Sequence, residues 1–202
     1  KHWGVPGEWD CNYGGTVKSV DGGQTWKYLT NLQWPGDSQF CQMFPVQVDD
    51  MVYVAGIGGG RTGVARMMRV PVASYEDKSA YEYLTAVKDD GTAVFEKDAL
   101  ERACPFLPRA VGELSMMYSD YLEEWMVTYI SGPDLIMRTA KNIWGPYSPP
   151  VTLVAQADFP GLYGAFMSPH YVSADGSKIG FLMSLWEPVY NVAMMECDLV
   201  RK

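Results

Sequence analysis

The sequence comprises 202 residues with a formal net charge of −8, and 48% of its residues are hydrophobic. A chain of this length and composition is expected to fold around a substantial core rather than to remain disordered. The negative charge argues against electrostatic binding to nucleic acid, and no run of about 18 apolar residues is present to span a membrane. The four cysteines and two histidines have no metal-ligand spacing, so we expect neither a metal nor another cofactor.

The first informative segment is Ser19–Trp26, with the sequence Ser-Val-Asp-Gly-Gly-Gln-Thr-Trp. It has the form of an Asp-box, a hairpin corner at which one strand ends and a second begins. The Asp21 carboxylate is expected to accept hydrogen bonds from its own turn, and Gly22 and Gly23 to take positive φ angles. Trp26 is expected to bury its ring beneath the corner. Because Asp-boxes recur in the blades of β-propellers, the segment predicts architecture rather than chemistry.

Short alternating runs separated by Gly, Pro, Asp and Asn follow along the rest of the chain, and they predict strands with one short helix at 97–102. The expected strands are 15–20, 25–29, 40–48, 51–55, 63–70, 81–85, 114–118, 125–130, 135–139, 164–167, 178–185 and 190–197. About a dozen strands at this spacing correspond to roughly three to four four-stranded sheets. We therefore predict an all-β chain in which residues 1–202 form a single β-propeller domain that lacks its N-terminal blade.

The sulfur-containing residues give two further expectations. Cys11, Cys41, Cys104 and Cys197 fit two disulfides in a secreted protein, with three possible connectivities, and buried free thiols in a reducing compartment are the alternative. Methionine pairs at 67–68, 116–117 and 194–195 place one Met on each face of a strand, which we interpret as core filling.

Four segments, taken in their order and spacing, carry a resemblance to a known family. They are Gly58–Arg66, Glu113–Tyr118, Arg138–Ser148 and the stretch from Tyr163–Phe166 to Ser184–Val192. From about Gly14 onward the chain resembles the propeller family catalogued as the domain of unknown function DUF4185, some members of which are endo-D-arabinofuranases. The resemblance implies a five-bladed propeller, a pocket at its axis and glycosidic hydrolysis by acidic residues. Such domains usually begin with a Gly-Asp-Thr-type strand, and nothing like it precedes Trp3 in this sequence.

Glycoside hydrolysis takes two carboxyl groups, of which one protonates the leaving oxygen and the other attacks or activates water. Glu113 is the first candidate for a catalytic acid, because it begins a strand after Gly112 at a position that can face the central channel of a propeller. An ordinary strand-end glutamate is the alternative. Asp10 and Asp37 lie in aromatic, glycine-containing loops and are candidates for the second carboxylate.

Candidates for substrate binding are aromatic, cationic or amide side chains close to turns. Trp186, Tyr190 and Asn191 offer a stacking ring and an amide, the usual combination for a sugar. Arg61 follows three glycines, which let a backbone come close to a ligand. For His170 a structural or surface role is the alternative. The full set is Arg61, Tyr163, His170, Trp186, Tyr190 and Asn191.

These observations predict a secreted carbohydrate-active propeller that hydrolyses a furanoside-type, arabinan-like polysaccharide. The alternative is a non-catalytic carbohydrate-binding or scaffold propeller without the acid pair. The expected partners are a polysaccharide or oligosaccharide and the N-terminal segment as a separate chain, because an open blade leaves apolar faces and strand edges exposed.

Overall fold

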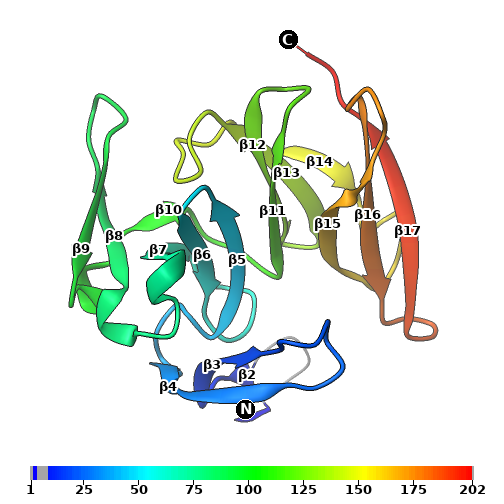
Figure 1. Ribbon diagram of the computed structural model, residues 1–202. Coiled ribbons are helices and arrows are strands. Elements are labelled where there is room, and N and C mark those ends of the chain that lie inside the picture. Colours follow the sequence, from blue (N-terminus) through cyan, green and yellow to red (C-terminus); the bar gives the residue numbers. More distant parts are fainter. Residues whose placement is uncertain (1, 4–8, 202) are drawn as a thin grey trace. The chain divides into compact units, whose positions relative to one another are not determined.

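The computed structural model describes residues 2–3 and 9–201, and the chain divides into two compact units, Lys1–Phe106 and Leu107–Lys202. The regular structure of the described residues is almost entirely β-strand (Figure 1). The helical elements among them are the short 3₁₀ turns η1 (Val72–Ser74), η2 (Lys78–Ala80) and η3 (Leu100–Arg102). The all-β class predicted from the sequence is confirmed, and a single propeller domain over the whole chain stays a prediction.

Unit 1 contains two small strand pairs and one larger sheet. The small pairs are β1 (His2–Trp3) with β2 (Trp9–Asp10), and β3 (Tyr13–Lys18) with β4 (Lys27–Pro35). The larger sheet has the order β5 (Gln42–Val48), β6 (Met51–Ile57), β7 (Ala65–Pro71), β8 (Glu82–Val87) and β9 (Ala93–Lys97), and β10 (Pro105–Leu107) also pairs with β7.

The core of unit 1 collects the inward side chains of these strands. Along β4, Leu29, Leu32 and Trp34 are buried and pack with Phe40 in one cluster. The indole Nε1–H of Trp34 donates to the Tyr83 hydroxyl at 2.9 Å, so the polar group of the buried ring has a partner inside the core.

Unit 2 consists of two antiparallel sheets. The first contains β11 (Leu114–Ser119), β12 (Glu124–Ser131), β13 (Asp134–Ala140) and β14 (Val151–Val154), and the second contains β15 (Leu162–Val172), β16 (Lys178–Leu185) and β17 (Asn191–Asp198).

The two sheets of unit 2 pack face to face around a shared apolar cluster. Met126, Leu135 and Met183 are fully buried in this cluster. Two hydrogen bonds cross the interface: the Thr128 hydroxyl donates to the Ala165 carbonyl at 3.2 Å, and the Met167 amide donates to the Ser115 hydroxyl at 2.9 Å. The adjoining strands β11 and β15 are therefore held in a fixed relation.

Each predicted strand corresponds to an observed one, with ends that differ by a few residues. The sequence analysis missed β1, β2, β9, β10 and β14, which are only two to five residues long and therefore show no clear alternation of apolar and polar side chains. The helix predicted at 97–102 is only the 3₁₀ turn Leu100–Arg102, because Lys97 pairs with Glu82 as the last residue of β9.

The turn predicted around Asp21 is present. The Ser19 hydroxyl donates to Asp21 Oδ1 at 2.7 Å, and the Thr25 amide donates to the same oxygen at 2.9 Å. Gly22 and Gly23 have φ angles of 72° and 88°, a region that L side chains rarely adopt. The Thr25 hydroxyl and amide, together with Ser19, lower the pKa of Asp21 from 3.8 to about 2.

The position expected for Trp26 is wrong. Its side chain is 62% exposed rather than buried beneath the corner. The indole Nε1–H donates to the Gly23 carbonyl at 3.0 Å, and this bond holds the ring beside the turn at the surface.

A second turn of the same chemistry joins β15 to β16. The Asp175 carboxylate accepts hydrogen bonds from the Ser173 hydroxyl at 2.7 Å and from the Ser177 amide at 3.1 Å. The Lys178 amide donates to the Ser173 hydroxyl at 2.9 Å. These bonds from Ser173 and Ser177 lower the pKa of Asp175 to about 2, so the turn is built by the charged carboxylate.

The low pKa of Asp21 predicts a pH-dependent stability. Since the folded-state pKa is below the unfolded value, the stabilisation by this carboxylate is complete above about pH 4 and is lost as the pH falls towards 2. We expect Asp21→Asn to lower the urea midpoint near pH 7, and the difference from wild type to shrink between about pH 4 and pH 2. Asp89→Asn, at an exposed position between β8 and β9, is the control and should leave the midpoint unchanged. A constant difference at every pH would contradict this role.

Candidate functional site

In unit 1, the loops that carry the two candidate aspartates meet at a disulfide. Cys11 and Cys41 are bonded, with their Cα atoms 6.1 Å apart. Asp10 is the last residue of β2 and directly precedes Cys11. Asp37 follows Gly36, which lies so close to the Cys11 carbonyl that an added Cβ would overlap it. Both aspartates are exposed, and their loops are anchored at the same point.

The glycine run before Arg61 packs against the same region. An added Cβ at Gly59 would collide with the backbone of Trp9, and Gly58 faces the side-chain amide of Gln39. Contacts within the protein therefore leave no room for side chains at Gly58 and Gly59. Arg61 lies half-buried on the same loop. Gln39, whose Oε1 atom is buried, also lies in this region. The sequence analysis did not select it, because a single polar residue in a turn has no distinguishing pattern.

In unit 2, Glu113 directly precedes β11. The Gly112 amide donates to the Ile130 carbonyl at 2.8 Å, which continues the pairing of β11 with β12 and fixes the backbone next to Glu113. The Glu113 side chain is half-buried, and its Oε2 atom is shielded from solvent. One oxygen of the carboxyl group is therefore enclosed by protein.

Four of the predicted binding residues lie together at one end of the sheet β15–β17. Tyr163 pairs with Ser184 on the neighbouring strand, and Asn191 pairs with Leu185. The Tyr163 and Tyr190 rings are 6.2 Å apart and nearly perpendicular, at 84°. We call this group, which consists of Tyr163, Trp186, Tyr190 and Asn191, the aromatic platform.

The aromatic platform combines exposure with a defined backbone. Trp186 is 48% exposed and Tyr190 is 75% exposed. The Trp186 amide donates to the Gly161 carbonyl at 2.9 Å, and the Val192 amide donates to Asn191 Oδ1 at 2.8 Å. Large aromatic rings held at the surface in this way are able to stack on a ligand.

His170 is not part of the aromatic platform. It lies on β15 near the end opposite Tyr163, and its side chain is exposed. Its amide donates to the Ser168 hydroxyl at 3.3 Å. The structure therefore brings together four of the predicted binding residues and leaves His170 apart.

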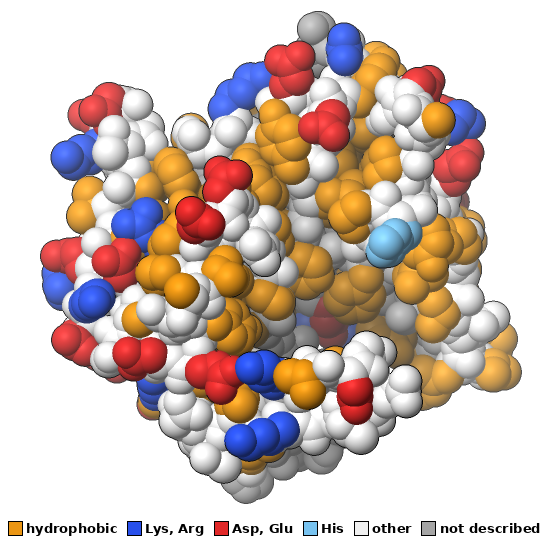
Figure 2. Space-filling view, viewed as in Figure 1, with side chains coloured by type: hydrophobic (Ala, Val, Ile, Leu, Met, Phe, Trp, Pro, Cys, Tyr) orange, Lys and Arg blue, Asp and Glu red, His pale blue; other side chains and the backbone are white. Residues whose placement is uncertain are grey.

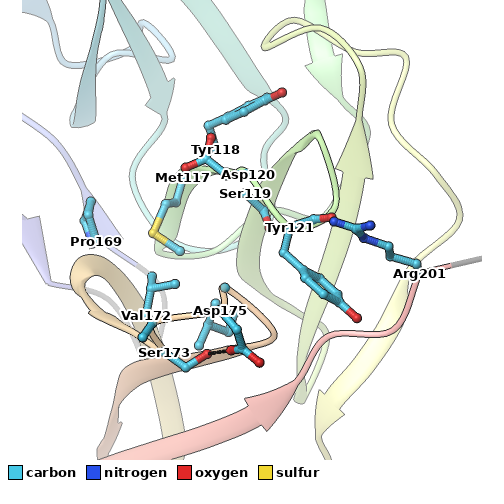
Figure 3. A pocket seen from close by; sticks show the side chains of 13 residues that line it. Met117, Tyr118, Ser119, Asp120, Tyr121, Pro169, Val172, Ser173, Asp175 and Arg201 are labelled. Atoms are coloured by element: carbon cyan, nitrogen blue, oxygen red, sulfur yellow. Dashed lines mark hydrogen bonds between the residues drawn. The ribbon is translucent and has the colours of Figure 1, made fainter.

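A cavity of about 360 Å³ opens at the far end of β11 from Glu113 (Figure 3). Its lining includes Met117, Tyr121, Asp175 and Arg201. The guanidinium of Arg201 is 4.4 Å from the centre of the Tyr121 ring, and its Nε–H donates to the Tyr121 carbonyl at 2.7 Å. Because Arg201 and Asp175 are already engaged with neighbouring groups, this cavity is a weaker candidate than the aromatic platform.

The expectation of two disulfides is wrong, because only Cys11 and Cys41 are bonded among the four cysteines. Cys104 and Cys197 are free thiols, both half-buried, and burial raises the pKa of each. Each thiol is therefore expected to be protonated at neutral pH.

In residues 2–3 and 9–201, no group of at least three His, Cys, Asp or Glu side chains is arranged to hold a metal ion. Over the same residues, no helix is long and apolar enough to cross a membrane.

The sheets define this chain as an all-β protein of the propeller type, and comparison with known proteins gives the family. The chain belongs to the family described as DUF4185, a domain of unknown function, whose model matches residues 1–196. A curated relative, the notoamide biosynthesis cluster protein J' of Aspergillus versicolor, is 29% identical over 196 residues, which cover 92% of this chain and 51% of the relative.

One of two similar solved structures has the same fold. A protein of Bacteroides ovatus, described as a "putative hydrolase", matches with a TM-score of 0.51 at 15% identity, over 87% of this chain and 54% of the other. A bifunctional GH43-CE protein of Bacteroides eggerthii matches with a TM-score of 0.41 at 12% identity, over 79% of this chain and 26% of the other. The chain spans about half the length of the curated relative and of the Bacteroides ovatus protein.

The length of the loop that the disulfide closes predicts a measurable stabilisation of the folded protein. The Cys11–Cys41 bond closes a loop between residues 30 positions apart, so its removal is expected to destabilise the protein by about 3–4 kcal/mol. Urea unfolding of the Cys11→Ser/Cys41→Ser double variant measures this loss, and Cys104→Ser is the control. Thiol titration of the unfolded wild-type protein should find two free thiols before reduction and four afterwards. Four thiols without reduction would show that the bond does not form.

Proposed function

We propose that this protein binds a saccharide chain at the aromatic platform and hydrolyses its glycosidic bonds. The observation that carries the proposal is the exposure of Trp186 and Tyr190 beside the amide of Asn191 on an anchored strand end. The apolar face of a sugar ring stacks on an aromatic ring, while an amide bonds to its hydroxyl groups. Single exposed aromatic residues need no explanation, but a group of this size marks a binding surface.

For the hydrolytic step we assign Glu113 as the general acid that protonates the leaving oxygen. Asp10 and Asp37 stay the candidates that the sequence predicts for the second carboxylate, the group that attacks the anomeric carbon or activates water. The position of Glu113 directly before β11, where the Gly112 backbone is fixed by pairing with Ile130, supports its role. Arg61 and His170 are further proposed contacts to the substrate. A furanoside-type, arabinan-like polysaccharide is the proposed substrate, because the chain resembles a family some members of which are endo-D-arabinofuranases.

We also propose that the protein is secreted, because a disulfide such as Cys11–Cys41 persists in an oxidising compartment. A polysaccharide substrate outside the cell is consistent with this location. The N-terminal segment, supplied as a separate chain, is a further proposed partner, because sheets with open faces and edges need cover.

The second candidate function is carbohydrate binding without turnover. Both candidates for the second carboxylate, Asp10 and Asp37, are exposed, as ordinary loop aspartates are. A protein with one catalytic acid and no partner carboxylate would retain the aromatic platform and bind sugar without cleaving it.

Binding at the aromatic platform is tested with Trp186→Ala. Loss of one stacking ring is expected to weaken the affinity for arabinan oligosaccharides by roughly tenfold, measured by isothermal titration calorimetry. Trp26→Ala is a matched control, because Trp26 is also exposed, at 62%, but lies in unit 1 on the Asp21 turn. Equal effects of the two substitutions would show that the platform does not bind the sugar.

Catalysis is tested with Glu113→Gln, which keeps the size of the side chain and removes its acidity. We expect kcat on arabinan to fall by roughly 10²–10⁴-fold while oligosaccharide affinity is retained, measured by reducing-sugar release and calorimetry. Glu101→Gln, at an exposed position in η3, is the control. Saccharide binding by a wild-type protein that releases no reducing sugar would favour the non-catalytic function.

A further inference from the structure

The cavity at the far end of β11 is formed by three segments of unit 2. They are the turn between β11 and β12, the turn between β15 and β16, and the segment after β17 that carries Arg201 (Figure 3). The cavity volume of about 360 Å³ is within the range of small-molecule sites, roughly 300–1,000 Å³. Since every lining residue belongs to unit 2, the packing of that unit defines the cavity.

Bonds and close contacts between the three segments fix the shape of the cavity. The Leu199 amide donates to the Ser177 carbonyl at 2.7 Å, and the Leu199 side chain is buried in the core of unit 2. The Arg201 Nε–H donates to the Tyr121 carbonyl at 2.7 Å. An added Cβ at Gly176 would come within 3.0 Å of Tyr121 Cβ, so the two turns are in contact. The cavity is therefore preformed, and a ligand does not have to order these segments when it binds.

Arg201 is held in position as a donor of hydrogen bonds. Its guanidinium is 4.4 Å from the centre of the Tyr121 ring, and the bond to the Tyr121 carbonyl uses only its Nε–H group. The N–H groups of its terminal nitrogens keep their capacity to donate, and a guanidinium has no acceptor. The contacts that engage Arg201 therefore position it for a ligand instead of consuming it.

Asp175 supplies the opposite kind of group, an acceptor. Its Oδ1 atom accepts from the Ser173 hydroxyl at 2.7 Å and from the Ser177 amide at 3.1 Å. The Ser177 hydroxyl is 2.9 Å from both Oδ1 and Oδ2, and it has a single hydrogen to donate. Because Ser173 and Ser177 lower the pKa of Asp175 to about 2, the group is a carboxylate at neutral pH and only accepts. The Oδ2 atom thus retains capacity for a hydroxyl group of a ligand.

This combination of groups favours a neutral, polyhydroxylated ligand. The charged residues of the lining are Asp120, Asp175 and Arg201, so a simple anion meets two carboxylates and a simple cation meets the guanidinium. Figure 2 shows acidic and basic side chains next to one another at the top of the view, where the β11–β12 turn and the segment after β17 lie in Figure 1. A hydroxyl group both donates and accepts, so it pairs with either sign. Met117 and Ile179 add apolar wall, which suits the C–H groups of a sugar ring.

We propose that this cavity is a second saccharide-binding site, which holds a single sugar unit with Arg201 and Asp175 as its polar contacts. The inference rests on the proposed function for the class of ligand and deepens it by adding a site. The cavity lies at the end of β11 away from Glu113 and at the end of β15 away from Tyr163. Since the six residues of β11 extend over about 20 Å, a saccharide has to span several units to reach both ends. A polysaccharide held in the cavity stays near Glu113, which raises its effective concentration there.

NMR spectroscopy of the ¹⁵N-labelled protein provides the test, because it reports on each site separately. On titration with arabinan oligosaccharides we expect the amide signals of residues 119–121 and 173–176 to shift, in addition to those of the aromatic platform. Arg201→Gln is expected to weaken the affinity measured from these cavity signals by at least roughly tenfold, since a charge-assisted hydrogen bond is lost. Arg102→Gln, the same change at an exposed arginine of η3, is the control and should leave this affinity unchanged.

A second variant blocks the cavity and keeps its polar groups. Ala174 is an exposed residue of the lining, so Ala174→Trp places a large ring where the sugar unit would bind. We expect the saccharide-induced shifts of residues 119–121 to disappear in this variant. An amide spectrum that is otherwise as dispersed as that of the wild type shows that the variant is folded.

The same spectra contain the outcomes that would overturn the second site. Shifts confined to the aromatic platform, or cavity shifts that both variants leave unchanged, would contradict it while the proposed function stands. Cavity shifts produced by a free amino acid such as serine but not by the saccharide would identify a zwitterionic ligand instead. The absence of shifts at both sites would also overturn it, and arabinan hydrolysis by wild type and Glu113→Gln then judges the proposed function separately. Cavity shifts without platform shifts would support the second site and contradict binding at the platform.

Discussion

The structure depends on one constraint, namely that an antiparallel sheet with apolar side chains on both faces needs a layer against each of them. In unit 2, Met126 and Leu135 of one sheet meet Phe181 and Met183 of the other, and this contact buries one face of each. The hydrogen bond from the Met167 amide to the Ser115 hydroxyl then sets the relation of β15 to β11. The residues next to these strands, Glu113 among them, take their positions from that packing.

The candidate residues lie where strands end, because a strand end is anchored by pairing while its side chains remain accessible. Tyr163 and Asn191 are the clearest cases, since each belongs to a paired strand and each lies beside an exposed ring. In unit 1 the Cys11–Cys41 disulfide provides this anchoring, because the loops of Asp10 and Asp37 meet at Cys11. A rigid frame with open ends is a suitable arrangement for binding a long, flat ligand.

Local chemistry explains most of what was predicted correctly. The Asp21 turn could be anticipated because its hydrogen bonds connect residues at most four positions apart. The turn at Asp175 uses the same local chemistry, but its sequence lacks the Thr-Trp ending of the first. Trp26 was misplaced because its burial depends on which layer lies next to the turn, and no local pattern carries that information.

The sequence by itself determined the all-β class, the order of most strands and the turn chemistry, since each follows from alternation, glycines and hydrogen bonds between near neighbours. Only the tertiary structure decided which cysteines pair, because Cys11 and Cys41 are joined through contacts among separate loops. It also decided that Tyr163 joins Trp186 and Tyr190 while His170, on the same strand as Tyr163, does not. It left Val192 and Met194 exposed, since alternation shows that a strand has two faces but not which of them another layer covers.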